Sequence, residues 1–531
     1  MDEPHAPSPA GTGHILQNRQ RLSRSLLWQL QRRYFAQAGL DAWRSGTVPH
    51  YVTSNPFIAR AYAQLVLGWL RDVAPLLNRH APLYIVELGA GPGRLAYHFL
   101  QQFFGLLAHS SLSDVPVCYV MTDYSQRTVA GWQSQPQFQP WIAAGRLDFA
   151  LFDGERNDSL TLLHGGVTLA PGTLANPLAL LANYFFDGLT HDAFFIEDGQ
   201  LFESLVTLTT PRPGADPTDP ALLPDIACIY TQEPASSDYY DDPAFNQILA
   251  GYQQELLLTH LLFPIGGLHC LRNLSRLSGG RLLLLAGDKG YHHAEELLLR
   301  EEPGYDVHGS FSLTVNFHAL GEYVRQLGGL FLSTPQRPVQ LDVCTFVLDP
   351  AGQAYPETRL AYQQAIVQGG PDDFFVLKQG LEKHYAALEL TQLLAYLRLS
   401  GWDHKIFLGC FPALLEKLDQ ADEPLRLALH EMVQQVWQGY LGLGEVSDVP
   451  FCLGLVLSGL GYHAEAAAFL QRSLLQHGPD AATFYNLALC YQALGQDAEA
   501  VAMVTQALAR QPDLAPAGAL HAQLVARRSP G

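Results

Sequence analysis

The sequence predicts a doubly wound α/β domain that is followed by an all-α domain of helical repeats. An apolar run at 83–88, typical of a buried strand, leads through three alternate glycines into a helical pattern. Beyond residue 350, strand patterns end and helical periodicity continues along the chain. We therefore expect an α/β domain over 15–350, with an insertion at 209–280, and a helical domain over 351–531.

Composition limits the class of protein. The 531-residue chain is 48% apolar, enough for two to four domains of about 150 residues each. Its net charge of −19 argues against nucleic acids and anionic membrane surfaces as partners. The seven cysteines are scattered and form no C-x-x-C pair, so we expect no disulfide framework and no metal site. The N-terminus lacks the apolar segment of a signal peptide, and we expect a cytoplasmic protein.

The turn after the first strand predicts a nucleoside site. Glycines let the backbone turn sharply and approach a ligand closely. Their spacing is G-x-G-x-G, because Arg94 stands where dinucleotide-binding proteins have a third glycine. The acid Glu87 within the strand favours a cationic, amine-bearing ligand over a pyrophosphate. The alternative is a tight turn in an unrelated α/β protein. The expected cofactor-binding residues here are Glu87, Gly89, Ala90, Gly91 and Gly93.

The chain before and after this turn supplies the first flanking elements. Residues 1–14 are rich in Pro, Gly and Ser and are expected to be disordered, and helical periodicity runs from 15 to 34. A second helix is expected at 58–73, before the first strand. The second strand, 117–121, is followed by Asp123 and Tyr124, and a carboxylate there can accept both hydroxyls of a ribose. A helix N-cap is the alternative role of Asp123.

The third and fourth strands border the other parts of a ligand. The third strand, 147–152, ends at Phe152 and Asp153, which can contact a nucleobase; a solvated turn is the alternative for Asp153. The fourth strand, 179–183, leads to Asn183, Tyr184 and Asp187, which we place near the reacting group. A helix cap is the alternative for Asp187.

The rest of the α/β domain follows in short elements. The sequence predicts a hairpin of 194–196 with 202–208, a Pro-rich loop at 209–224, helices at 245–262 and 268–277, and a strand at 281–286. His292 and His293 are adjacent and lack a third ligand at metal spacing, so we interpret them as loop residues. The segment 311–317 is a strand or a loop entering a helix, and 340–347 closes the sheet.

The end of the chain carries an internal repeat. A shift of 34 residues superposes apolar and small positions of 451–474 on those of 485–508. This pattern resembles tetratricopeptide repeats, in which small residues stand where two helices touch. Helices expected at 390–399 and 425–436 can cap the stack, because such arrays need about three units.

The glycine motif resembles motif I of S-adenosylmethionine-dependent methyltransferases. Residues 45–348 resemble, more specifically, the MidA-like methyltransferases, whose mitochondrial members assist respiratory complex I assembly by methylating a protein arginine. Four segments carry the resemblance: 50–54, 87–95, 183–189 and 309–320. It implies a Rossmann-like methyltransferase domain that binds S-adenosylmethionine.

The chain departs from that family where the acceptor should bind. Pro49 and His50 stand where the family has Gly-Asp, Tyr184 stands in place of Glu, and Thr190 replaces Pro. Since paired carboxylates orient a guanidinium, losing two acids weakens the case for an arginine acceptor.

The sequence-based hypothesis is therefore methyl transfer to a protein side chain or a small molecule, with the repeats recruiting the acceptor or a partner. The expected catalytic residues are Asp187, Tyr184, Asn183 and His50, with Asp187, Tyr184 and His50 as candidate bases. A non-catalytic scaffold that retains the fold is the alternative. An NAD-dependent oxidoreductase is disfavoured by Glu87 and Arg94.

Overall fold

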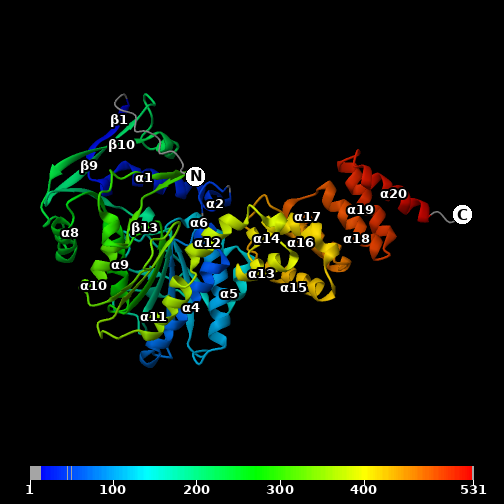
Figure 1. Cartoon of the computed structure of the whole chain (residues 1–531), viewed down its shortest axis with the longest axis horizontal. Coiled ribbons are helices and arrows are strands. Elements are labelled where there is room, and N and C mark those ends of the chain that lie inside the picture. The colour runs from blue at the N-terminus through cyan, green and yellow to red at the C-terminus, as the bar shows by residue number, and fades with distance from the viewer. Residues whose placement is uncertain (1–12, 45, 50, 529–531) are drawn as a thin grey trace. The chain divides into compact units, whose positions relative to one another are not determined.

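The chain divides into an α/β unit and an all-α unit, as the sequence predicts at the level of fold class. The computed structural model describes residues 13–44, 46–49 and 51–528. Contacts separate the two units between Val376 and Leu377. Strands occur only in the first unit among the described residues, and the second is built from helices (Figure 1).

A seven-stranded sheet forms the centre of the first unit. Its strands lie in the order β17 (Leu330–Leu332), β18 (Asp342–Leu348), β12 (Leu282–Asp288), β7 (Leu178–Asn183), β2 (Leu83–Leu88), β3 (Val117–Asp123) and β4 (Leu147–Leu151). The five strands from β12 to β4 are parallel, and β18 is antiparallel to both of its neighbours. The chain adds β3 and β4 on one side of β2 and then returns to place β7 on the other. The order thus reverses between β2 and β7, and ligands of open α/β sheets bind outside the carboxyl ends at such a point.

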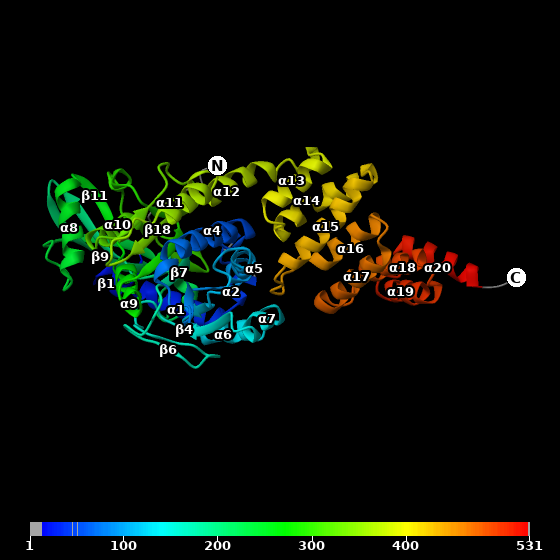
Figure 2. The same cartoon turned by 90° about the horizontal axis from the view of Figure 1, so that it is seen from below.

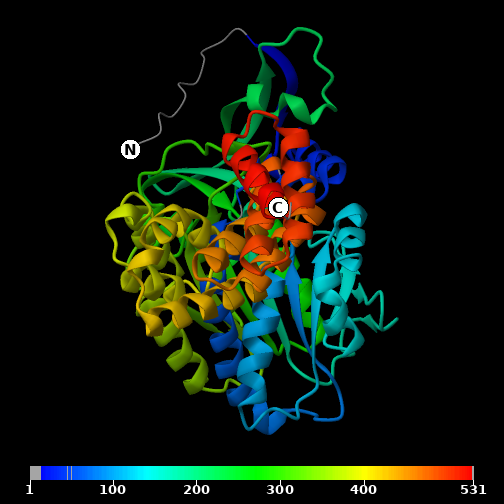
Figure 3. The same ribbon diagram turned by 90° about the vertical axis from the view of Figure 1, so that its right-hand side faces the viewer.

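Helices cover both faces of this sheet. On one face, α4 (Pro56–Val73), α5 (Arg94–Ala108) and α11 (Pro356–Tyr362) pack together, with Phe99 of α5 against Tyr119 of β3. On the other, α9 (Ile265–Leu277) and α10 (Phe317–Gln326) share one core with Val86 and Leu88 of β2. Two shorter helices, α6 (Gln126–Gln133) and α7 (Gln139–Ala143), contact β4, in the cyan part of Figure 3.

A second, antiparallel sheet is inserted after β7. It contains the predicted hairpin, β8 (Asp192–Glu197) and β9 (Gln200–Thr210), with β1 (His14–Gln20), β10 (Ala227–Pro234) and β11 (Leu258–Phe263). The prediction of a helix from residue 15 was wrong for 15–20, since this segment pairs with β9. The helix α1 begins only at Leu26 and runs to Ala38, capped by Ser25, and α2 (Asp41–Arg44) follows.

The predicted helix 245–262 was wrong in its second half. Helix α8 (Pro243–Glu255) ends at Glu255, and β11 begins at Leu258. Along β11 the side chains alternate between buried and more exposed positions. This segment is a strand because its backbone pairs with β8, and its alternating burial fits the two-residue period of a strand rather than the period of a helix. Six short strands form three further pairs among the described residues: β5 (Leu160–Thr161) with β6 (Thr168–Leu169), β13 (Gly290–Tyr291) with β16 (Val315–Asn316), and β14 (Asp306–His308) with β15 (Ser310–Ser312).

The first unit continues beyond the expected boundary at residue 350 and includes helix α11. Asp72 of α4 accepts hydrogen bonds from the backbone N–H groups of Glu357 (3.1 Å) and Thr358 (2.8 Å). The Tyr362 hydroxyl donates to the carbonyl of Val343 in β18 (2.8 Å). These polar contacts attach residues 356–362 to the α/β unit, and nothing in the apolar pattern signals them.

Helical hairpins form the second unit (Figure 2). Its helices are α13 (Leu390–Leu399), α14 (His404–Lys417), α15 (Glu423–Gly439), α16 (Val449–Gly459), α17 (His463–His477), α18 (Ala481–Ala493), α19 (Asp497–Arg510) and α20 (Ala515–Arg528). Gly454 of α16 lies directly beneath Leu470 of α17, where a Cβ would be only 3.0 Å from the leucine Cγ. No helix in the described parts of either unit combines the length and apolar character that a membrane crossing requires.

Candidate active site

The glycine turn lies at the carboxyl end of β2, at the switch point of the sheet. Gly89, Gly91 and Gly93 have φ values of +63°, +50° and +76°, a region that costs other residues about 1–2 kcal/mol each. The turn is held by the Ala90 N–H, which donates to the Thr122 carbonyl of β3 (2.9 Å). Helix α5 starts directly after it. The glycines are therefore required by the backbone conformation itself.

Three aromatic side chains lie against this turn. A Cβ on Gly89 would be 3.0 Å from the Phe185 ring, and one on Gly91 would be 3.1 Å from the Trp43 ring. The Trp132 indole N–H donates to the Gly91 carbonyl (2.9 Å). The turn thus has fixed aromatic walls contributed by α2, α6 and the segment after β7.

The Glu87 carboxyl is buried below the strand. It is 3% exposed, and its Oε2 accepts a hydrogen bond from the Tyr119 hydroxyl (2.8 Å). Burial raises the pKa of Glu87 to about 8, although the Tyr119 hydrogen bond opposes this rise. At neutral pH the side chain is therefore mostly protonated, and the charge attraction inferred from the sequence is weak.

Asp123 is the last residue of β3, one strand away. Its Oδ1 accepts from the Ser125 N–H (2.8 Å), and Ser125, rather than Asp123, caps helix α6. The side chain is 7% exposed, and burial raises its pKa to about 7. Among the described residues no side chain donates to its Oδ2, and the backbone of Tyr124 and Ser125 favours its charged form. Tyr124 next to it is half-exposed.

At the end of β4, an arginine that the sequence analysis did not predict as a site residue binds two carboxylates. Arg32 of α1 donates to both oxygens of Asp153 (2.6 and 3.1 Å) and to Glu155 (2.6 Å). Its guanidinium also lies 5.4 Å from the centre of the Tyr124 ring. Phe152, in contrast, is buried in the core shared with α9. The surface available to a base at this end is therefore formed by Tyr124, Asp153 and Arg32 rather than by Phe152.

The end of β7 brings two distant segments together. Asn183 accepts from the Tyr62 hydroxyl (2.6 Å) and donates to the Thr53 carbonyl (2.8 Å), so it fixes the segment 51–54 to the sheet. Gly287 of β12 makes room for this network, since a Cβ there would be 2.7 Å from both polar atoms of the pair. His50, the predicted catalytic residue just before this segment, lies outside the described residues.

Tyr184 has a backbone conformation that is unusual for its residue type. Its φ is +47°, and its N–H donates to the Gly287 carbonyl (2.9 Å). Non-glycine residues in this region store about 1–3 kcal/mol of strain, and such residues cluster at functional sites. Burial raises the pKa of the Tyr184 phenol, so it is a neutral hydrogen-bond donor at physiological pH.

Asp187 is accompanied by a second carboxyl, which the sequence-based prediction missed. Asp288, fully buried at the end of β12, accepts from the backbone N–H groups of Asp187 (3.1 Å) and Lys289 (3.0 Å). Burial raises the pKa of Asp187 to about 7, and burial with the charge of Asp187 raises the pKa of Asp288 well above its ordinary value. An acid at the carboxyl end of a buried strand was the signal that could have found Asp288.

His292 lies in the loop after β13, as predicted, but its side chain is buried. Its ring nitrogens face two acceptors, the Asp342 carboxylate (2.6 Å) and the Thr334 carbonyl (2.9 Å). Asp342 raises the pKa of His292 against the effect of burial, which favours a protonated imidazole that donates to both acceptors. Cys344 donates to the same carboxylate (3.5 Å). The three groups satisfy one another as a structural ion-pair network.

Three solved structures have low similarity to the chain. An uncharacterized protein from Burkholderia thailandensis is 16% identical, with a TM-score of 0.36 over 67% of this chain and 85% of that chain. A second structure from this organism, bound to S-adenosyl-homocysteine, is 14% identical, with a TM-score of 0.35 over 66% and 90%. YrrB, a TPR protein with an unusual peptide-binding site, is 20% identical, with a TM-score of 0.22 over 28% and 82%.

No curated protein matches the chain. The family described as "Putative S-adenosyl-L-methionine-dependent methyltransferase" matches residues 65–261. This range contains the glycine turn, Asp123 and Asp187, and the match supports S-adenosylmethionine as the cofactor, as expected from the sequence. Over this range the chain is similar to a family of S-adenosylmethionine-dependent methyltransferases.

Proposed function

We propose that the first unit is a Rossmann-like methyltransferase domain that transfers a methyl group from S-adenosylmethionine to a protein side chain or a small molecule. The observation that carries the proposal is the left-handed glycine turn at the switch point, with Asp123 at the end of the neighbouring strand.

The residues around this point fit the cofactor. The glycine turn of 89–93, with Ala90, offers close backbone approach to the methionine part. The Asp123 carboxylate can accept the ribose hydroxyls, and Tyr124 and Asp153 border the base. Glu87 supports the site indirectly: its hydrogen bond with Tyr119 connects β2, which leads into the turn, to β3.

When bound, the cofactor supplies an activated methyl group, so the protein does not need a covalent nucleophile. Asn183, Tyr184 and Asp187 lie at the end of β7, where the acceptor would be positioned and shielded from water. Orientation of this kind can supply about 7–11 kcal/mol of a barrier. Asp187 is the base for an acceptor that must lose a proton, because its pKa of about 7 suits proton uptake at neutral pH.

The repeats of the second unit are tetratricopeptide-like in this proposal and recruit the acceptor or a partner. Helices α16–α19 follow the 34-residue period, and stacked helical hairpins form concave surfaces that bind extended peptides. A non-catalytic scaffold that retains the cofactor is the second candidate, favoured by Tyr184 in place of a family acid. Transfer of label from the cofactor to any component of a lysate would rule out the scaffold.

Calorimetric titration with S-adenosylmethionine tests the proposal. The wild-type chain should bind saturably, Asp123→Ala should weaken binding about tenfold or more by removing a charge-assisted pair of hydrogen bonds, and Gly91→Arg should abolish it. Asp241→Asn, an exposed acid far along the chain, is the control and should bind like the wild type. Equal affinity in all four proteins would reject the site, and saturable NADH binding would instead favour an oxidoreductase.

A further inference from the structure

A second feature of the first unit, a large cavity, lies beside Asp187. Its volume is about 640 Å³, and it is bounded by β11, β13, β16 and the loop 297–306. Small-molecule sites in proteins typically have volumes of about 300–1,000 Å³. No single side chain of a protein substrate would fill this space.

The cavity adjoins the candidate active site through two connections. Asp306, in its wall, forms an ion pair with Lys289 (2.8 Å), the residue directly after Asp288. Leu313 lies between two lining residues, Ser312 and Thr314, and its N–H donates to the carbonyl of Asp187 (3.3 Å). After burial, the charge of Asp306 is one of the influences that raise the pKa of Asp187, as expected for neighbouring carboxylates.

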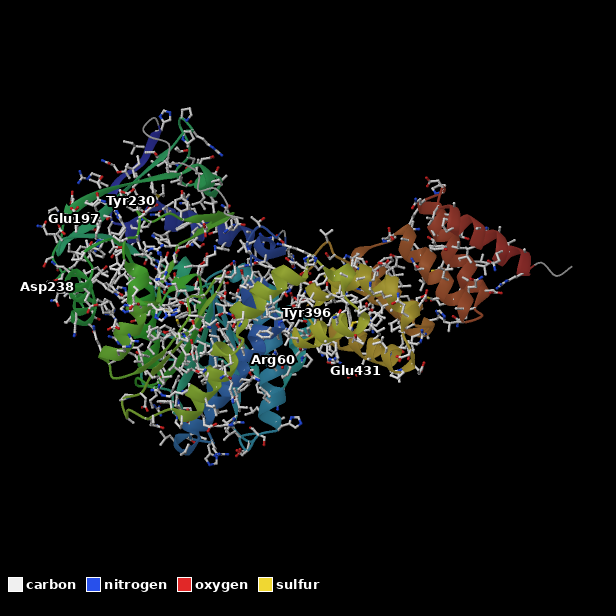
Figure 4. All side chains as sticks on the ribbon, in the orientation of Figure 1. Arg60, Glu197, Tyr230, Asp238, Tyr396 and Glu431 are labelled. Atoms are coloured by element: carbon white, nitrogen blue, oxygen red, sulfur yellow. The ribbon has the colours of Figure 1, made fainter. Side chains whose placement is uncertain are left out.

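The wall of the cavity is held in place by the antiparallel sheet. Tyr230 of β10, labelled in Figure 4, donates from its hydroxyl to the carbonyl of Pro303 (3.1 Å). The Tyr305 hydroxyl donates to the Ile226 carbonyl, and the His260 N–H donates to the Arg300 carbonyl (3.1 Å). The loop therefore has defined contacts along its length, and the cavity is preformed rather than dependent on loop closure.

The charges around the cavity favour a cation. Glu301 and Glu302 have no ion-pair partner within the described residues, whereas the guanidinium of Arg300 is stacked 3.8 Å above the Tyr291 ring. The Nδ1 atom of His260, another lining residue, is buried and has no hydrogen-bond partner in the described part of the chain. The surplus of acids adds to the field of a chain with a net charge of −19, which attracts cationic ligands.

We propose that this cavity is the acceptor site and that the acceptor is a small molecule carrying a primary amine. This inference rests on the proposed function, of which it names the substrate class. Three observations together carry it: the size of the cavity, its unpaired acids, and the contacts of Asp306 and Leu313 that connect its wall to Lys289 and Asp187.

The transfer balances with residues already in place. The Asp187 carboxylate takes one proton from the ammonium group of the acceptor, which frees the nitrogen lone pair. The nitrogen then forms a bond to the methyl carbon, and the electron pair of the carbon–sulfur bond stays on sulfur, leaving S-adenosylhomocysteine. The product is a secondary ammonium ion, and Asp187 releases its proton to water.

Calorimetry on the full chain without cofactor tests the cavity directly. The probes are putrescine and tyramine, with the matched neutral alcohols 1,4-butanediol and tyrosol. The amines should bind and the alcohols should bind at least about fivefold more weakly. Joint replacement of Glu301→Gln and Glu302→Gln should weaken amine binding about fivefold, the upper effect of an exposed ion pair. Glu295→Gln, an exposed acid outside the lining, should leave it unchanged.

A variant that fills the cavity separates charge from shape. Thr314→Trp should abolish amine binding while S-adenosylmethionine still binds, which also shows that the variant is folded. Equal affinity for amines and alcohols, no amine binding at millimolar concentration, or amine binding unaffected by Thr314→Trp would each overturn the inference. Failure of the proposed function would look different, because the wild-type chain would then not bind S-adenosylmethionine at all.

Discussion

At the scale of single residues, the candidate site is a set of carboxyl groups with pKa values set by burial. Asp123 and Asp187 both have pKa values near 7; Asp123 ends the parallel strand β3, and Asp187 lies in the turn that follows β7. Buried acids at strand ends cost stability unless a ligand or a hydrogen bond compensates them, and perturbed pKa values mark functional sites. Their protonation should therefore be visible in cofactor binding.

The affinity for S-adenosylmethionine should rise with pH through about 7. Asp123 accepts both ribose hydroxyls only as a carboxylate, and its pKa of about 7 keeps much of it protonated below that pH. Calorimetric titrations from pH 6 to 8.5 measure this dependence. Asp123→Asn should bind more weakly and without this pH dependence; an unchanged pH profile in the variant would show that another group titrates.

His292→Gln should lower the free energy of unfolding by about 3–5 kcal/mol at pH 6, because it leaves Asp342 buried without its partner. The raised pKa of His292 makes the pair most stabilising below the unfolded-state pKa of His, and this stability is lost as pH rises through the folded-state value. Urea unfolding at pH 6 and pH 9 should show a difference between variant and wild type that shrinks at the higher pH. His80→Gln, at an exposed position, is the control.

At the scale of elements, the sequence predicted the parallel strands and the hairpin of β8 with β9, but not the other strands of the antiparallel sheet. Strands β2, β3, β4, β7 and β12 are buried on both faces, so their continuous apolar runs are unambiguous in the sequence. Residues 15–20 and 258–263 carry alternating or mixed patterns, and only pairing with β9 and β8 decides that they are strands. Asp123 and the glycine turn were found because they follow buried strands; Arg32 was not, because it comes from a helix distant in sequence.

Replacing two glycines of the same strand–turn–helix unit by alanine should change the stability of the chain in opposite directions. Gly91→Ala should destabilise the chain by about 1–2 kcal/mol, since φ is +50° and the new Cβ meets Trp43. Gly105→Ala, within α5 with no atom within 4 Å of the new Cβ, should stabilise it by about 0.5–1 kcal/mol. Chemical denaturation measures both. A Gly91→Ala variant as stable as Gly105→Ala would contradict the turn geometry described above.

At the scale of the whole molecule, the two units have separate cores and should unfold in separate steps. Leu470 is fully buried in the second unit, against Gly454. Leu470→Ala should cost about 2–5 kcal/mol of stability and lower one calorimetric transition only. S-adenosylhomocysteine should raise the other transition, because a ligand stabilises the unit that binds it. Both changes falling on a single shared transition would show that the units unfold together.

The central claim is that a nucleoside cofactor binds where β2 turns into α5. The most direct measurement is a crystal structure of the chain with S-adenosylhomocysteine. The ribose hydroxyls should lie within hydrogen-bonding distance of Asp123, with the amino-acid part along Gly89, Ala90 and Gly91. Density for the ligand elsewhere, or ribose hydroxyls out of hydrogen-bonding distance of Asp123, would contradict the account.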